Sequence, residues 1–282
     1  MTQRPLVSIV VPCFKKAKYL PVALDSILAQ TYQDWECVIV NDGSPDNTEK
    51  IAHKYCQKDS RFHYLYQTNK GVSAARNNGL RQMSGKYILA LDADDWISET
   101  YIEKAVTRLE ENDNIRVVYS RYERFSSEGS GEWELPPYSY EGFLMGDMVI
   151  VCSAIYRRAD FERVGGYDET LQGFEDWDLW LSILGEQDEV YRLDELLFHY
   201  RTDSSIVSRQ VSQNERHLRI RLCEKHEDKY KPRYADLLYY YKAYKELGEY
   251  ERLLERVYAS HAYRLGKFMI KPFAWARKKL SL

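Results

Sequence analysis

The sequence of 282 residues contains no apolar run that approaches the roughly 18 residues of a membrane-spanning helix. Its N-terminal segment, MTQRPLVSIVVPCF, also lacks the apolar stretch and cleavage site of a secretory signal peptide, because the apolar run ends at Pro12. No period is repeated three times along the chain, which argues against a solenoid. We therefore expect a globular protein of the cytoplasm.

Cysteine is scarce and scattered. The five cysteines are odd in number and none has CxxC spacing: Cys13, Cys37, Cys56, Cys152 and Cys223. This pattern argues against a disulfide framework and against a zinc site, and it favours a reducing cytosol.

Charge of one sign is not in excess either. The 40 Lys and Arg residues nearly balance 43 Asp and Glu residues, and the net charge of -3 gives no reason to expect nucleic-acid binding by the chain as a whole. Hydrophobic residues make up 44% and charged residues 29%, which is typical of a soluble globular protein. The length suits one large domain, or one domain with a smaller appendage.

The first hundred residues alternate between short apolar runs and amphipathic stretches. The stretches 18–31 and 71–85 have helical periodicity, and Gly85 is expected to end the second helix. Four apolar runs are predicted as buried strands: 6–12, 35–42, 62–67 and 86–91. This alternation predicts an α/β fold with a Rossmann-like, mostly parallel sheet and helices on both faces.

The pattern loosens after residue 98. Helices are predicted at 98–112 and 174–184, strands at 115–124 and 147–158, and a loop at 126–137. Helix dominates from about residue 212 onward. We therefore predict an α/β domain over residues 1–208 and a helical C-terminal extension over residues 209–282.

Negative charge is concentrated where the fourth predicted strand ends, in the stretch KYILALDADDW. Asp92, Asp94 and Asp95 lie within four positions, and each carboxylate disfavours ionisation of its neighbours. A positively charged partner is therefore expected. Carboxylates, together with phosphate oxygens and waters, are typical ligands of Mg²⁺ or Mn²⁺. The alternative is a turn and helix N-cap in which the helix dipole favours the acids.

Other acids occupy comparable places in the predicted fold. Asp42 follows the second strand, and Glu175 and Asp176 begin a later helix. Ligands of open parallel sheets bind beyond the carboxyl ends of the strands. These acids are therefore candidates for the same site.

Six segments of the chain form a pattern that is weak for each segment alone and specific for a protein family when all six occur in order. They are SIVVPCF, QTYQDWECVIVNDGSPDNT, NKGVSAARNNGL, SGKYILALDADDW, VGGYDETL and FEDWDLWL. In this order the segments resemble the GT-A glycosyltransferases of family 2, which are inverting and nucleotide-sugar-dependent. The resemblance covers roughly residues 5–203 and implies a GT-A fold and a nucleotide-diphosphate sugar as donor.

The resemblance implies a nucleotide site. Pro12 and Phe14 match the loop that lies against the nucleobase, and Asp42 matches the acid that accepts a hydrogen bond from the base. An acceptor-only side chain suits the imide N–H of uracil or thymine, which favours UDP or dTDP. Lys70 and Gly71 match a segment near the diphosphate.

The resemblance also implies a cation, Mn²⁺ or Mg²⁺. Asp92 and Asp94 match the DxD pair, with Asp94 as the direct metal ligand, Asp92 facing the sugar or ribose, and Asp95 assisting either. Arg76 matches an arginine that bridges phosphate or positions the acids, with a salt bridge at the sheet edge as its alternative. His199 is a further candidate ligand, and a structural role is its alternative.

Asp176 matches the catalytic base of the family, and Glu175 would orient the acceptor or Asp176. An inverting transfer is a single in-line displacement, in which a carboxylate takes the proton of the attacking hydroxyl. The metal stabilises the departing diphosphate. Asp203 departs from the family pattern, in which many relatives have a histidine, and Arg201 nearby could reach a phosphate.

The C-terminal segment 264–282 interleaves large apolar residues with six Lys or Arg residues and contains no acid. It either lies on an anionic membrane surface or packs on the domain as a terminal helix. Membrane contact would fit a lipid-linked acceptor, so we expect a saccharide or lipid-linked acceptor in surface polysaccharide or glycoconjugate synthesis. The expected location is the cytoplasm, with peripheral contact at the inner face of the membrane.

Two other functions compete with this interpretation. A nucleotidyltransferase would need a glycine-rich loop after the first strand, and PCFKKAKYL contains no glycine. A catalytically silent sugar-binding or membrane scaffold protein would be indicated by degraded motifs, whereas Asp42, Asp92, Asp94 and Asp176 are all present. Turnover of a nucleotide sugar separates these classes.

Overall fold

The chain is described by a computed structural model, which covers residues 7–202 and 207–233. It divides into two compact units, Met1–His226 and Glu227–Leu282. The predicted helical extension and basic tail lie largely outside the described residues, as does Asp203, so the predicted boundary at residue 208 stays a prediction. In the second unit the structure describes only α9 (Glu227–Tyr230) and the 3-10 turn η1 (Lys231–Arg233).

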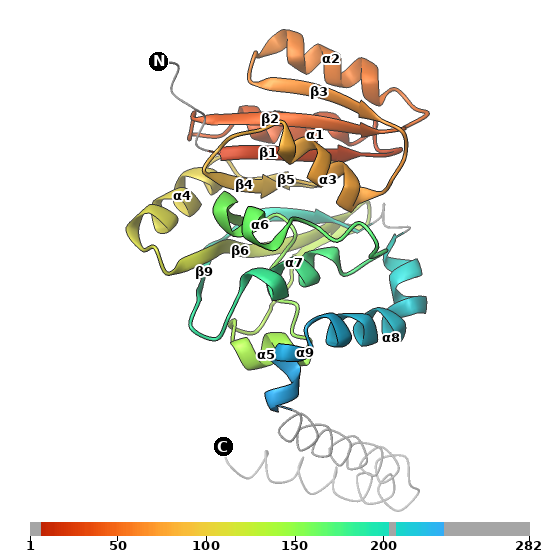
Figure 1. The fold of residues 1–282 in the computed structure, drawn as a ribbon. Helices are drawn as coiled ribbons and strands as arrows, with labels where there is room; N and C mark the ends of the chain where they lie inside the picture. The colour runs from red at the N-terminus through yellow and green to blue at the C-terminus, as the bar shows by residue number, and fades with distance from the viewer. Residues whose placement is uncertain (1–6, 203–206, 234–282) are drawn as a thin grey trace, which may run out of the picture. The chain divides into compact units, whose positions relative to one another are not determined.

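Four parallel strands form the first half of the sheet, in the order β3-β2-β1-β4 (Figure 1). Their bounds are β1 (Val7–Cys13), β2 (Trp35–Asp42), β3 (Phe62–Gln67) and β4 (Tyr87–Ala90). The helices that connect them are α1 (Leu20–Leu28), α2 (Thr48–Lys58) and α3 (Val72–Arg81). β1, β2 and β4 are buried along almost their whole length and are mostly apolar, as strands covered on both faces require, whereas β3 at the edge of the sheet is largely half-buried or exposed.

Helix α3 packs closely against β1 and β2, in front of the sheet in Figure 1. A Cβ atom on Gly79 would lie 2.8 to 2.9 Å from the side chains of Val10, Val38 and Val40, so only glycine permits this approach. The helix ends at Arg81, four residues before the predicted end at Gly85. Gly85 instead allows the chain to pass close to Ser8. The Gly85 amide donates a hydrogen bond to Ser8 Oγ at 2.8 Å.

The second half of the sheet is mixed. β8 (Ile155–Arg157) runs antiparallel between β4 and β6 (Ile115–Ser126), β9 (Glu189–Arg201) runs parallel to β6, and β5 (Trp96–Ile97) closes the edge antiparallel to β9. β7 (Gly129–Glu132) forms a hairpin with β6 inside the predicted loop 126–137. The α/β class with flanking helices is confirmed, and the parallel pairing predicted for the sheet holds in its first half.

Helices follow the strands of this half as well. They are α4 (Tyr101–Glu111), α5 (Tyr140–Met145), α6 (Arg158–Val164), α7 (Glu175–Ile183) and α8 (Val207–Lys225). One continuous apolar core runs through the sheet, and its largest buried side chains include Trp35, Tyr87 and Tyr101. None of the helices within the described ranges is long and apolar enough to cross a membrane.

Candidate active site

The predicted acids lie where strands of the first half end. Asp42 is the last residue of β2, and Asp92, Asp94 and Asp95 follow β4 in a turn that is closed by the hydrogen bond from the Asp95 amide to the Asp92 carbonyl (3.0 Å). Because β1, β2 and β4 are parallel neighbours, their carboxyl ends share one edge of the sheet. This edge is the floor of the site.

Arg76 on α3 joins the two groups of predicted acids. Its guanidinium donates to Asp92 Oδ1 and to Asp176 Oδ1, each at 2.8 Å, and lies 3.6 Å from Glu175 Oε1. The side chain is only 1% exposed. Burial alone would lower the pKa of Arg76, but Asp176 and Asp92 raise it well above its ordinary value. The arginine is therefore a buried, charged bridge between acids far apart in the sequence.

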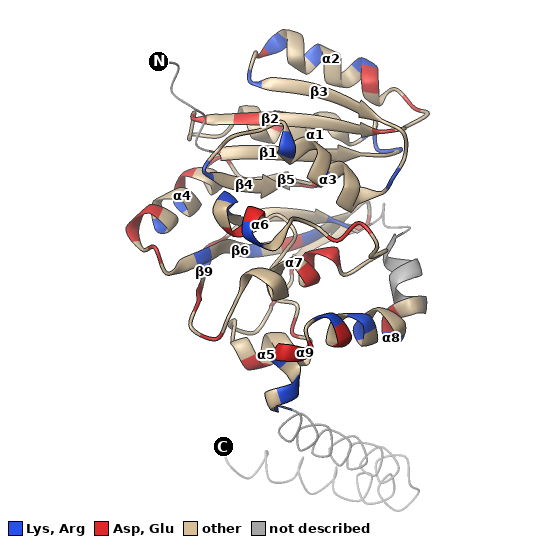
Figure 2. Cartoon of the chain, viewed as in Figure 1, with Lys and Arg blue, Asp and Glu red and all other residues tan. Residues whose placement is uncertain are grey.

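Asp176 lies in the first turn of α7, which Figure 2 shows as an acidic helix start. Gly173 and Phe174 precede the helix with φ of 126° and 59°, so two successive left-handed residues set its direction. Burial raises the pKa of Asp176 to about 7, and the charges of Glu175 and Asp92 add to this rise against the opposing effect of Arg76. A carboxylate with this pKa is suited to accept a proton at neutral pH.

The other side of α7 is held by α8. Asp178 is 1% exposed and accepts hydrogen bonds from Lys225 Nζ at 2.8 Å and from His226 Nε2 at 2.9 Å. Lys225 also donates to Asp168 at 2.8 Å. Sequence reasoning missed this cluster, because its basic members lie 47 and 48 residues beyond Asp178 and belong to no recognised motif.

The acids after β4 have different partners. Asp94 Oδ2 accepts from Lys16 Nζ at 2.6 Å, and Arg201 Nε donates to the Asp94 carbonyl at 3.1 Å. Asp95 is 1% exposed, and its Oδ1 accepts from the Arg201 amide at 2.8 Å while its Oδ2 is buried without a hydrogen-bond partner. Burial, with Asp92 and Asp94, raises the pKa of Asp95 well above its ordinary value.

His199 lies beside this loop but is engaged elsewhere. Its ring stacks on Trp96 with 3.3 Å between centroids, Nδ1 lies 2.7 Å from Glu123 Oε1, and Nε2 lies 3.0 Å from Ser98 Oγ. Both ring nitrogens thus have protein partners, which favours the structural alternative for His199, and its metal ligation stays a prediction.

A different residue comes close to the acids. Within the described ranges, potential ligand atoms of Asp92, Asp95 and Cys152 all lie within 4.8 Å of one another. Cys152 was not among the residues selected from the sequence. Cys152 lies in the turn just before β8, which pairs antiparallel with β4, and no local motif reveals that pairing.

Asp42 holds the segment that follows β3. Its Oδ1 accepts from Gln67 Nε2 and from the Lys70 amide, both at 2.8 Å, and its Oδ2 accepts from Asn69 Nδ2 at 3.1 Å and from the Gly71 amide at 2.9 Å. An ionised carboxylate has about four acceptor positions, and all four are used here. The predicted hydrogen bond from a nucleobase would therefore have to replace one of these donors.

The remaining predicted nucleotide residues lie around the same edge. Pro12 is buried in β1, whereas Phe14 just beyond it is 39% exposed. Lys70 is exposed, and Gly71 adopts a φ of 92° at the start of α3. An exposed aromatic ring suits a base, and the start of a helix suits a phosphate group, while the Lys70 and Gly71 amides themselves donate to Asp42.

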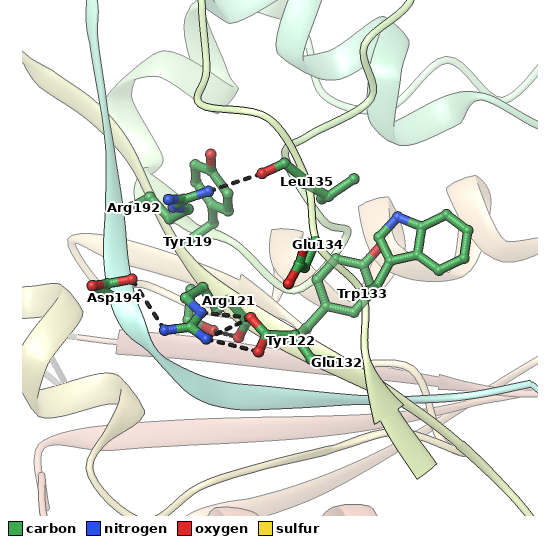
Figure 3. Close-up of a pocket in the computed structure, with 10 residues that line it drawn as sticks. Tyr119, Arg121, Tyr122, Glu132, Trp133, Glu134, Leu135, Arg192 and Asp194 are labelled. Carbon is green, nitrogen blue, oxygen red and sulfur yellow. Dashed lines mark hydrogen bonds and ion pairs between the residues drawn. The ribbon is translucent and has the colours of Figure 1, made fainter. Parts of the chain in front are cut away.

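A pocket whose lining contains none of these acids is shown in Figure 3. It is lined by residues of β6, β7 and β9 and of the segment after β7: Tyr119, Ser120, Arg121, Tyr122, Glu132, Trp133, Glu134, Leu135, Arg192 and Asp194. Arg121 bonds both Glu132 and Asp194, and Arg192 donates to the Leu135 carbonyl. None of these lining residues was predicted as a site residue.

Comparisons with proteins of known sequence give two relatives of similar likeness. An uncharacterised glycosyltransferase of Rickettsia typhi is 36% identical over 193 residues, which cover 65% of this chain and 60% of the relative. The uncharacterised glycosyltransferase EpsJ of Bacillus subtilis is 32% identical over 213 residues, or 70% of this chain and 61% of the relative. In both cases the match spans less than two thirds of the relative's length.

Solved structures with this fold include two with bound nucleotide sugars. Residues 1–349 of TarS from S. aureus, in complex with UDP-GlcNAc, align with a TM-score of 0.61 at 22% identity over 72% of this chain and 60% of that chain. The mannosyltransferase PcManGT from Pyrobaculum calidifontis, in complex with GDP-Man and Mn²⁺, aligns with a TM-score of 0.62 at 18% identity. The alignment covers 95% of this chain and 84% of that chain. These likenesses show that the fold is GT-A.

The family model described as glycosyl transferase family 2 matches residues 8–165, which is more than half of the chain. The matched region includes the edge of the sheet, Arg76 and the acids after β4, while Asp176 lies beyond it. The resemblance seen in the sequence motifs is thus confirmed, and this chain belongs to glycosyl transferase family 2.

Proposed function

We propose that this protein transfers a sugar from a nucleotide-diphosphate sugar to a hydroxyl group of an acceptor, with inversion at the anomeric carbon. The observation that carries this proposal is Arg76, which joins Asp92 on the donor side to Asp176 and Glu175. A single buried guanidinium thus keeps a diphosphate-side acid and a potential base at a fixed separation.

Asp176 acts as the base. Its pKa of about 7 leaves a substantial fraction ionised at neutral pH, and its side chain keeps 20% of its surface exposed for an incoming hydroxyl. As the hydroxyl oxygen attacks the anomeric carbon, the proton passes to the Asp176 carboxylate, and the bond to the diphosphate breaks. Glu175 and Arg76 orient this carboxylate.

The acids after β4 fit a divalent cation, Mn²⁺ or Mg²⁺. The buried Asp95 Oδ2 has no hydrogen-bond partner, and oxygen donors are those that both ions prefer. Asp92, Asp94 and Asp95 would hold the ion, and Lys16 would leave Asp94 or remain as a second positive charge. When bound, the ion would neutralise the diphosphate and stabilise it as a leaving group. The Mn²⁺ complex of the Pyrobaculum mannosyltransferase supports this proposal.

The nucleotide lies along the edge formed by Phe14, Lys70 and Gly71, with Asp42 positioning the last two. One structural neighbour binds UDP-GlcNAc and another binds GDP-Man, so the neighbours do not select one nucleotide. Our proposal of UDP or dTDP therefore rests on the sequence alone. We further propose a saccharide or lipid-linked acceptor of surface polysaccharide or glycoconjugate synthesis, in the cytoplasm and at the inner face of the membrane.

The test is turnover. The protein is incubated with Mn²⁺, a panel of UDP, dTDP and GDP sugars and a panel of glycosides, and release of the nucleoside diphosphate is followed. The anomeric configuration of the product, read by NMR, separates inversion from retention. Nucleotide binding without transfer to any acceptor or to water would favour the silent binding protein, and retention would exclude the single displacement.

A further inference from the structure

Two turns at the same end of a strand pair bring Cys152 to the acids. β8 pairs antiparallel with β4, and the partners are Leu89 with Ile155, Ile88 with Tyr156 and Tyr87 with Arg157. Asp92 lies in the turn after β4, and Cys152 lies in the turn before β8, where the Ala154 amide donates to the Val151 carbonyl at 3.2 Å. Because the strands are antiparallel, the end of β4 and the start of β8 are neighbours, and so are these two turns.

The side chains of these two turns converge. One potential ligand atom each of Asp92, Asp95 and Cys152 lies within 4.8 Å of the other two. Asp95 is 1% exposed and its Oδ2 has no hydrogen-bond partner, although buried carboxylate oxygens are normally satisfied. An unpartnered oxygen in an acidic cluster indicates a site that is completed by a cation.

We propose that Cys152 is a further protein donor of this cation site, beside the acids after β4, and that the site therefore prefers thiophilic divalent ions such as Zn²⁺ or Co²⁺ to Mg²⁺. Thiolates select such ions, whereas carboxylates alone suit Mg²⁺. The proposal deepens the proposed function by identifying the cation class of the same site. Its test requires no turnover.

The thiol is protonated before a cation binds. Burial raises the pKa of Cys152 well above its ordinary value, and the charges of Asp92, Asp176 and Asp95 add to the effect. A divalent cation reverses that balance, because it neutralises the acids and binds the sulfur as thiolate. The thiol proton leaves to solvent as the metal–sulfur bond forms, so no oxidant or reductant is needed.

The experiment is a titration of the full chain with Cd²⁺ and Co²⁺, followed by the ultraviolet thiolate-to-metal absorption, with free Mg²⁺ in excess. Wild type should develop the band at one metal equivalent, and Cys152→Ser should lose it. Cys223→Ser, which removes an exposed thiol, is the matched control and should keep the band. Asp95→Asn should weaken binding at least about tenfold, since even residues that only orient ligands commonly contribute that factor.

Each other outcome overturns the proposal. A wild-type protein without the band has no thiolate ligand, and a band that survives in Cys152→Ser belongs to another cysteine. A band that is lost in Cys152→Ser but is indifferent to Asp95→Asn shows a metal held without the acids. Thermal unfolding without metal verifies that each variant is folded. Transfer with Mn²⁺ in the turnover assay would leave the proposed function intact even if the cadmium band were absent.

Discussion

Two carboxylates of the site are held in different ways. Asp42, in the parallel half of the sheet, accepts hydrogen bonds from two backbone amides and two side-chain amides, all from residues 67–71. Asp176, on α7 between β8 and β9 of the mixed half, is held by the guanidinium of Arg76, which lies 100 residues earlier in the chain. The first acid depends on neutral donors from one short segment, and the second depends on one buried charge.

The difference follows from what each acid has to do in the proposed mechanism. A carboxylate with four neutral donors is fully satisfied and shapes a loop without reacting. A carboxylate that is buried beside other acids, with one cationic partner, has a raised pKa and an exposed oxygen edge, which suits proton transfer. We therefore expect changes at Asp42 to affect donor binding and changes around Asp176 to affect turnover.

The largest effect is expected for Asp176→Asn. The amide keeps the shape but cannot accept the proton, so kcat should fall by roughly 10² to 10⁴. Steady-state transfer assays measure this loss, and a thermal shift with nucleotide and Mn²⁺ should stay at the wild-type level. Near-normal transfer would contradict the assignment of the base.

Arg76→Met is expected to have the next largest effect. Removing the guanidinium leaves Asp92 and Asp176 without their shared partner in a buried setting, which commonly costs about 3 kcal/mol of unfolding free energy. Urea denaturation measures the loss. Arg81→Met, on the same helix with a largely exposed side chain, is the matched control and should change stability by about 0.5 kcal/mol or less. An equal loss of unfolding free energy in both variants would show that Arg76 does not act as a bridge between the acids.

Asp42→Asn tests the other half of the comparison. An amide nitrogen facing two N–H donors leaves them unsatisfied, at a cost of about 1 to 3 kcal/mol. The Lys70–Gly71 segment should loosen, so KM for the donor should rise while kcat changes little. Asn69→Ala, which removes one donor only, should have a smaller effect in the same direction. A fall in kcat with an unchanged donor KM would break the distinction drawn between the two acids.

The pH dependence of kcat/KM should report the ionisation of Asp176, the acid that is held by the charge of Arg76. Because the ionised form of Asp176 is reactive, kcat/KM should fall as the pH drops below about 7, approaching tenfold per pH unit. Glu175→Gln removes a neighbouring negative charge and should move the midpoint to lower pH. A midpoint that does not move in this variant would show that another group controls the profile.

Lys225→Met should have the smallest effect. Its side chain is 40% exposed, so its ion pairs with Asp168 and Asp178 contribute about 1 kcal/mol or less. We expect a slight loss of stability and a modest decrease of kcat with donor KM unchanged, since α7 is held less firmly. An unchanged kcat would show that His226 alone is sufficient to hold Asp178.

Sequence reasoning succeeded where structure is local. The strands β1 to β4 are mostly apolar runs, and the acids lie at the ends of β2 and β4, so their common edge could be predicted from the order of elements. It failed where partners come from distant segments. The strand predicted at 147–158 is present only over the three residues of β8, and no local pattern identifies β4 as its antiparallel partner, so the position of Cys152 beside Asp92 could not be predicted from the chain.

His199 and Asp178 illustrate the same limit at single side chains. A histidine near the end of the family pattern suggested a ligand, but its ring is committed to Trp96, Glu123 and Ser98, which no spacing rule connects to it. Asp178 belongs to a recognised segment, yet its partner His226 lies outside every motif. Residue chemistry predicts what a side chain can do, and tertiary packing decides which partner uses it.

The bridge made by Arg76 also bears on how the chain acquires its structure during synthesis. Residues 7–92 contain the four parallel strands and Asp92, so the ribosome releases a nearly complete half-sheet before Asp176 is made. At about 5 to 20 residues per second, the second acid follows Arg76 by roughly 5 to 20 seconds. During that interval the guanidinium has only part of its final counter-charge, and closure of the half-sheet over it should wait for α7. One arginine would then make the two halves fold as a single cooperative unit.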